Sequence, residues 1–113
     1  MRILCKSKIH RATVTGLNKD YIGSIGIDAD LIEKADIWAG EKALVVNLSN
    51  GERWETYVGP LEKGSGKIEL YGGGALKGKQ GDLLIILAFA VTDEKIKPKI
   101  VLVDKNNKFK EYL

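Results

Sequence analysis

Gly23 and Ser24 form a dipeptide in which a nucleophilic hydroxyl follows the least hindered residue type. They interrupt the run DYIGSIGID at 20–28, whose apolar residues otherwise read as a β-strand. Glycine weakens a strand unless the backbone bends or approaches another group closely. A serine hydroxyl can attack the preceding carbonyl, and glycine there minimises hindrance and tolerates the strained backbone. β-Elimination of the resulting ester cuts the chain, and hydrolysis leaves a pyruvoyl ketone on the new N-terminus.

Two other interpretations of Ser24 need no self-cleavage. An isolated Gly-Ser pair is most often a bulge or a turn. A serine hydrolase would need a base and an orienting carboxylate, and His10 is the only histidine. The G-x-S-x-G elbow is also absent, because position 22 is isoleucine. We therefore do not expect a hydrolase.

Composition predicts a single soluble domain of 113 residues with a substantial core, since 44% of residues are hydrophobic and 29% are charged. No apolar run approaches the roughly 20 residues of a membrane span. The first ten residues lack the apolar stretch and cleavage site of a signal peptide. The single cysteine, Cys5, excludes an internal disulfide. Together these features predict a cytoplasmic protein that does not bind a membrane.

Charge and ligand residues give little support to nucleic-acid or metal binding. The net charge is +3, and the lysines are scattered apart from a group near the C-terminus that is typical of a solvated tail. One histidine and one cysteine make a Cys/His zinc site implausible within one chain. A small nucleic-acid-binding barrel remains an alternative, favoured only by the mild basic charge.

Most of the chain reads as short strands separated by turn signals. A helix is expected after residue 28, capped by Asp28 or Asp30 and burying Leu31, Ile32 and Ala35. Residues 72–82 read as a loop with at most one helical turn. Many short strands with one or two helices predict a small closed β-barrel. The expected strands are 11–15, 20–27, 42–48, 54–58, 67–71, 83–91 and 100–104.

Seven motifs agree in order and spacing with one known family, over residues 1 to about 105. The chain resembles the pyruvoyl-dependent aspartate 1-decarboxylases. The resemblance implies a six-stranded double-psi β-barrel, a homotetramer with active sites between subunits, and cleavage into residues 1–23 and 24–113. The motifs are KIHRATVT (8–15), YIGSIGID (21–28), NGERWETYV (50–58), GSG (64–66), GGGA (72–75), GD (81–82) and PKIVLVD (98–104).

The resemblance also implies a role for each matching residue. Ser24 would become the pyruvoyl group, Gly23 would end the small fragment, and the Thr56 hydroxyl would hold the Gly23 carbonyl during processing. Tyr57 would return a proton after carbon dioxide leaves, while Arg53 and Lys8 would bind the substrate carboxylates. The remaining implied site residues are Gly72, Gly73, Gly74 and Ala75, whose loop approaches the substrate, and His10 and Tyr21, which line the site.

The implied reaction converts L-aspartate to β-alanine and carbon dioxide in pantothenate and coenzyme A biosynthesis, with the pyruvoyl group as electron sink. A maturation factor that assists cleavage is a possible partner. Tyr71 departs from the family pattern, which has asparagine there, and Gly26 and Gly59 also differ. Because Tyr71 replaces an amide with a large phenol, a homologue with impaired processing, or a non-catalytic barrel module, is the alternative.

Overall fold

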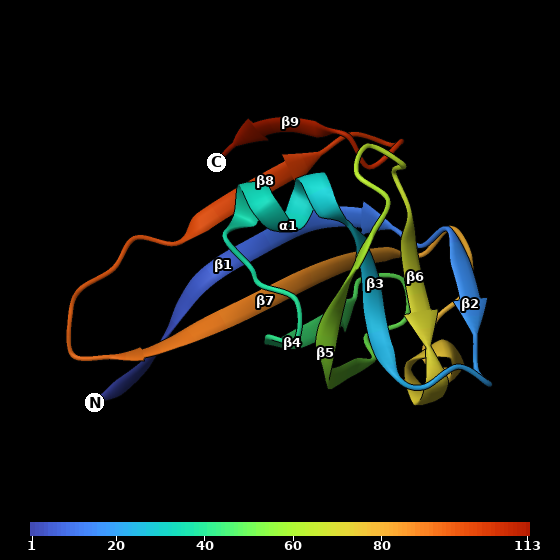
Figure 1. Cartoon of the computed structure of the whole chain (residues 1–113), viewed down its shortest axis with the longest axis horizontal. Coiled ribbons are helices and arrows are strands. Elements are labelled where there is room, and N and C mark those ends of the chain that lie inside the picture. The colour runs from blue at the N-terminus through green and yellow to red at the C-terminus, as the bar shows by residue number, and fades with distance from the viewer.

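The computed structural model describes residues 1–113 as a mainly β protein with one α-helix and one 3-10 helix (Figure 1). The long strands β1 and β7 cross the molecule, and β2, β3 and β6 gather at one end. The elements are β1 (Arg2–Thr13), β2 (Gly16–Asn18), β3 (Ser24–Asp28), α1 (Ala29–Ala35), β4 (Lys42–Asn47), β5 (Arg53–Leu61), β6 (Ile68–Tyr71), the 3-10 helix (Gly72–Leu76), β7 (Leu83–Thr92), β8 (Lys99–Val103) and β9 (Phe109–Tyr112).

The nine strands are hydrogen-bonded in the order β2-β6-β3-β5-β4-β7-β1-β8-β9. The expectation of six strands closed into a barrel is therefore not met by the strand order, which is open. The added strands are short: β2 and β9 have three and four residues and pair only with their inner neighbours at the two ends. Residues 109–112, expected as a tail, form β9 because Asn107 folds the preceding turn back toward β8.

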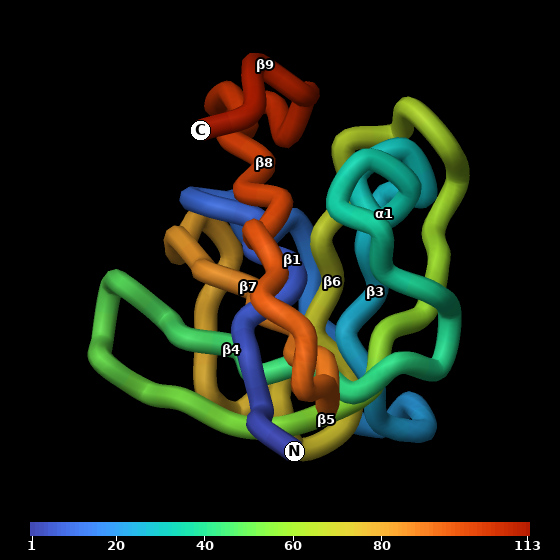
Figure 2. Tube along the Cα trace, turned by 90° about the vertical axis from the view of Figure 1, so that its left-hand side faces the viewer, coloured from blue at the N-terminus to red at the C-terminus, as the bar shows by residue number.

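The sheet curls so that the chain beyond β1 reaches β6, as the end-on view in Figure 2 lets the reader follow. The backbone N–H of Thr15 donates to Ile68 O at 2.8 Å, and Ile68 N–H donates to Thr15 Oγ1 at 2.9 Å. Two register shifts in β1, near Cys5 and near His10, accompany its long curved path. The curled sheet encloses one core in which Ile9, Ile25 and Ile86 are fully buried.

Asp28 joins the end of β3 to the start of α1. Its carboxylate accepts the N–H of Asp30, as the cap expected from the sequence requires, and also those of Gly64 and Gly66. Burial by itself raises the pKa of Asp28, but the backbone N–H groups outweigh it, so its pKa lies below the usual range. Because the N-cap is Asp28, the capping-box position N3 is Leu31 and no capping box forms; Glu33 instead pairs with Lys63.

Asp28→Ala is expected to lower the free energy of unfolding by about 2–3 kcal/mol at pH 7, because it leaves backbone donors without an acceptor. A depressed folded pKa means that this stability is present above the unfolded pKa, about 3.9, and is lost as pH falls through the folded value. Urea unfolding at matched protein concentration should therefore show a gap between variant and parent that shrinks toward pH 3. Asp93→Ala, at an exposed carboxylate, is the control. A gap of equal size at both pH values would contradict this role.

No helix of this fold is both long enough and apolar enough to traverse a lipid bilayer. The only α-helix has seven residues and packs Leu31, Ile32 and Ala35 against the sheet. These are the three residues that the sequence pattern predicted for its buried face.

Candidate functional site

Ser24 has a backbone conformation that non-glycine residues rarely adopt. It is the first residue of β3, its φ is +108°, and it is only 9% exposed. The sequence contains a second Gly-Ser pair, Gly64–Ser65, in a tight turn. Ser65 has no positive φ, and its Oγ accepts the Lys67 N–H at 3.3 Å. Backbone strain therefore distinguishes the first pair from the second. Strand β3 begins here, so the expected strand 20–27 is wrong for residues 20–23.

A surface cleft of about 320 Å³ opens beside Ser24. It brings together five residues that the sequence predicted for the site: Gly23, Ser24, Thr56, Gly73 and Gly74. Four further residues line it that the sequence did not predict as site residues: Trp54, Glu55, Tyr71 and Lys77. Trp54 could have been predicted, because it is two residues from Thr56 on β5 and side chains two apart on a strand point to the same face. Nothing in the sequence indicated Lys77, whose ammonium pairs with Glu52 at 3.0 Å.

The backbone that precedes Ser24 is packed against the start of the Gly-rich loop (Figure 1). Gly72 has φ +61°, and a Cβ there would lie 2.9 Å from Gly23 Cα. Glycine is therefore required at 72 both by conformation and by close approach. The neighbouring residues, Ser24 and Tyr71, are paired across the antiparallel strands β3 and β6, so the close packing extends into β6. Ala75, in contrast, is buried in the core and does not line the cleft.

Two further glycines show how the Ser24 hydroxyl and the Gly-rich loop are packed. A Cβ on Gly59 would lie 3.7 Å from Ser24 Oγ, so the Ser24 hydroxyl is turned toward β5. A Cβ on Gly74 would lie 2.8 Å from Trp54 Nε1, so this part of the loop packs on the indole. Pro60 follows the residues of β5 that pair with β4, and its missing N–H therefore breaks no bond of that ladder.

Lys8, His10 and Arg53 lie on one face of the sheet but outside the cleft. His10 on β1 pairs with Ile85 on β7, which pairs with Val46 on β4, which in turn pairs with Arg53 on β5. Paired residues share a face, and β1 and β5 are three strand spacings apart, about 14 Å when measured along the curled sheet. The pKa of His10 lies below its usual value because of burial and then because of the cations Arg11 and Lys8. One chain therefore does not gather its predicted cations around Ser24.

Tyr57 lies on the strand beside Ser24, one residue before the first paired position, although it does not line the cleft. Val58 pairs with Ile25 in parallel register, so the residues that precede them, Tyr57 and Ser24, start from adjacent positions on β5 and β3. The Tyr57 side chain is 45% exposed. Its phenol is therefore accessible from solvent at the edge of the site.

The face that carries Lys8, His10 and Arg53 is apolar at its centre. Its cross-strand rows contain half-buried aliphatic side chains from β4 and β7. A hollow of about 380 Å³ at one end is lined by apolar residues with Lys42 and Glu55 at its edge. Exposed apolar residues on this end are Ile3, Phe89 and Val91.

Tyr71 and Tyr21 form an aromatic pair beside the cleft. Their ring centroids are 4.7 Å apart with an interplanar angle of 46°. The Tyr71 hydroxyl donates to Glu69 Oε1 at 3.2 Å. Burial and the Glu69 carboxylate raise the pKa of Tyr71 to about 12, so the phenol stays protonated at neutral pH. Tyr71 therefore does not reproduce the amide that it replaces, because its polar atom is engaged with β6.

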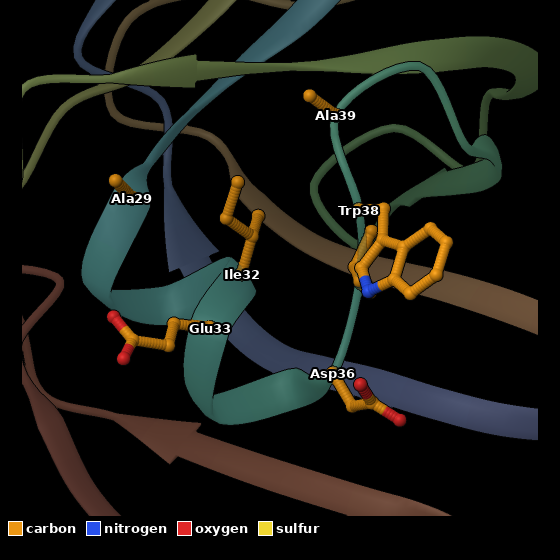
Figure 3. A pocket seen from close by; sticks show the side chains of 7 residues that line it. Ala29, Ile32, Glu33, Asp36, Trp38 and Ala39 are labelled. Atoms are coloured by element: carbon orange, nitrogen blue, oxygen red, sulfur yellow. The ribbon is translucent and has the colours of Figure 1, made fainter.

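A separate hollow of about 390 Å³ lies beside α1 and contains none of the predicted site residues (Figure 3). Its lining includes the carboxylates of Glu33 and Asp36 and the indole of Trp38, which follows the helix. Trp38 is 77% exposed. Its lining contains no hydroxyl, thiol or cationic side chain, in contrast to the Ser24 cleft.

Ser24 with its positive φ, Thr56 and the Gly-rich loop meet in one cleft of a mainly β fold, as the resemblance in the sequence implied. The chain belongs to the aspartate decarboxylase family, whose model matches residues 1–110. An aspartate 1-decarboxylase of Acetivibrio thermocellus is 52% identical to it, over 93% of this chain and 86% of the relative. One from Caldicellulosiruptor saccharolyticus is 55% identical over 91% and 84%, and one from Haloquadratum walsbyi is 47% identical over 97% and 96%.

Proposed function

We propose that this chain is a self-processing decarboxylase that converts L-aspartate to β-alanine and carbon dioxide, the step that supplies β-alanine for pantothenate synthesis. Family membership over residues 1–110 and relatives about half identical over nearly the whole chain support the activity. The observation that carries the proposal is the strained Gly23–Ser24 bond in the same cleft as Thr56.

Self-processing begins with attack of Ser24 Oγ on the carbonyl carbon of Gly23. The C–N bond breaks as the C–O ester bond forms, and the freed nitrogen takes the hydroxyl proton. Loss of the Ser24 Cα proton then expels Gly23 as a carboxylate and leaves position 24 as dehydroalanine. This enamine takes a proton at Cβ to become an imine, and water replaces the imine nitrogen with oxygen and releases ammonia. The products are residues 1–23 and 24–113. Thr56 acts as a donor to the carbonyl oxygen when it becomes an oxyanion.

The residues around Ser24 fit a pyruvoyl group formed in place. Gly23 has no heavy atom within 4 Å of its Cβ position, so the carbonyl next to it is unhindered on that side. The φ of Ser24 raises the energy of the uncleaved chain relative to its products. When formed, the group supplies an electron sink for decarboxylation.

The chain's own residues bind and protonate the substrate. Arg53 and Lys8 each hold a carboxylate, and the fork of Arg53 suits a bidentate pair. The phenol of Tyr57 delivers a proton to carbon after carbon dioxide leaves, and it starts from the backbone position next to Ser24. Gly73 and Gly74 line the cleft, and a Cβ on Gly73 would meet no heavy atom within 4 Å, so a substrate can approach the backbone there.

We further propose that the active enzyme is a cytoplasmic homotetramer whose sites lie between subunits. The separation of β1 from β5 by about three strand spacings, roughly 14 Å, supports a site in which Lys8 comes from another copy. The apolar centre of the shared face supports its burial between copies. The strands β6, β3, β5, β4, β7 and β1 form the double-psi barrel of the family in this proposal, closed by the Thr15–Ile68 bonds.

Intact mass of the purified chain, with an assay for β-alanine from aspartate, tests the proposal. Two masses are expected, those of residues 1–23 and 24–113, and the larger fragment should carry a ketone and no free amino terminus. β-Alanine should appear only in preparations that contain both fragments. A chain that stays whole after prolonged warming, and makes no β-alanine, would overturn the proposal in favour of a non-catalytic module or one that needs a maturation factor. Adding cell extract separates those two cases.

A further inference from the structure

The Tyr21–Tyr71 pair joins the segment before the cleavage bond to the strand beside it. Tyr21 lies two residues before Gly23, and Tyr71 is the register partner of Ser24 across β3 and β6. The rings are in contact, with centroids 4.7 Å apart. Between them the backbone is equally close, because the Cβ position of Gly72 is 3.3 Å from Tyr21 O. Residues 21–24 are therefore held by both ring and backbone contacts.

Gly26 provides the space into which the Tyr71 ring packs. A Cβ on Gly26 would lie 3.0 Å from Tyr71 Cε2 and 2.9 Å from Leu61 Cδ1. Any larger residue at 26 would therefore displace the ring or Leu61. The Tyr71 hydroxyl is anchored separately by Glu69. Two departures from the family pattern, Tyr71 and Gly26, are thus one packing arrangement.

We propose that Tyr21 and Tyr71 form an aromatic clasp, seated over Gly26, that positions the Gly23–Ser24 bond for self-cleavage. The clasp rests on the self-processing function proposed above. Holding Ser24 at φ +108° costs free energy, and contacts on both sides of the bond are needed to offset that cost. Tyr21 and Tyr71 are positioning residues, since neither takes part in bond making.

Cleavage would leave the two rings on different fragments, Tyr21 on 1–23 and Tyr71 on 24–113. The clasp then keeps the new carboxyl end of Gly23 beside the processed residue. Loss of the clasp should free this end without separating the fragments, because β1 remains paired with β7 and β8.

The first test measures the half-time of cleavage by intact mass, in chains purified rapidly after brief expression and then warmed. Tyr71→Leu removes the ring contact and should slow cleavage about two- to tenfold. Tyr71→Phe keeps the ring and loses only the hydroxyl, so it should be cleaved at the parental rate. Tyr112→Leu is the matched control, because it removes the other aromatic pair, Phe109–Tyr112 at 4.9 Å, at the opposite end of the strand order.

The second test does not depend on cleavage. In Ser24→Ala chains, which keep the peptide bond intact, Tyr71→Leu should speed amide hydrogen exchange at residues 21–25, and Tyr71→Phe should not. Parental cleavage together with unchanged exchange in Tyr71→Leu would overturn the clasp and leave the proposed function standing. Equal slowing by Leu and Phe would also overturn it, because the Glu69 bond would then be the active contact. If the parent never cleaves, the proposed function fails and the exchange result alone decides whether the clasp exists.

Discussion

Ser24→Ala is expected to yield a folded chain of full length that makes no β-alanine. The substitution removes the only hydroxyl that can attack the Gly23 carbonyl, so neither the cut nor the ketone forms. Alanine keeps the Cβ and removes only the oxygen, and we expect the melting temperature to be no lower than that of the parent. Intact mass and the β-alanine assay measure both outcomes on one preparation.

Ser65→Ala is the matched control for this experiment. Gly64–Ser65 has the same dipeptide sequence, but it lies in a turn and Ser65 has no positive φ. Ser65→Ala should be cleaved between residues 23 and 24 at the parental rate and retain full activity. Residual β-alanine from Ser24→Ala would refute the assignment of Ser24. A cut at Gly64–Ser65 would show that strain is not what selects the bond.

Tyr57→Phe separates processing from decarboxylation. The variant should be cleaved like the parent, because Thr56 and Ser24 are unchanged, but its kcat should fall by about 10²–10⁴-fold through loss of the proton donor. KM should change little, since the residues proposed to bind the substrate carboxylates, Arg53 and Lys8, are unchanged. Steady-state assays with aspartate, normalised to the cleaved fraction, give both constants.

Tyr112→Phe controls for loss of an exposed phenol. Tyr112 is 51% exposed, close to the 45% of Tyr57, and its hydroxyl donates to Lys34 O at 2.8 Å. Its removal should affect stability slightly and leave kcat unchanged. Full turnover by Tyr57→Phe would mean that the proton comes from another group.

Local patterns predicted most of the secondary structure. The cap at Asp28 and the face of Leu31, Ile32 and Ala35 are short-range features, and the sequence predicted both. The apolar run at 83–91 became most of β7 for the same reason. The first ten residues were not assigned, although they make up most of β1, because their alternation is broken by the shift near Cys5.

Contacts between distant residues decided what the patterns missed. The family resemblance implied six strands in a closed barrel, but the short strands β2 and β9 extend an open order. Strand β2 depends on pairing with β6, far along the chain, and β9 depends on the turn that returns it to β8. Local patterns also could not place Lys8 relative to Arg53. The resemblance assigns both residues to one site, but two strands, β4 and β7, lie between them in the sheet.

The sequence alone determined the family and the β-rich class of the fold, and it singled out Gly23–Ser24 as the pair proposed to react, because motif order and side-chain chemistry are properties of the chain itself. Only the tertiary structure decided which Gly-Ser bond is strained. The φ of Ser24 arises where Gly72 and Tyr71 pack against residues 21–24, and no local pattern contains that contact. Tyr71 and Gly26 are separate departures from the family pattern in the sequence. In the fold they are one feature, because the Tyr71 ring occupies the space beside Gly26 that a side chain there would need.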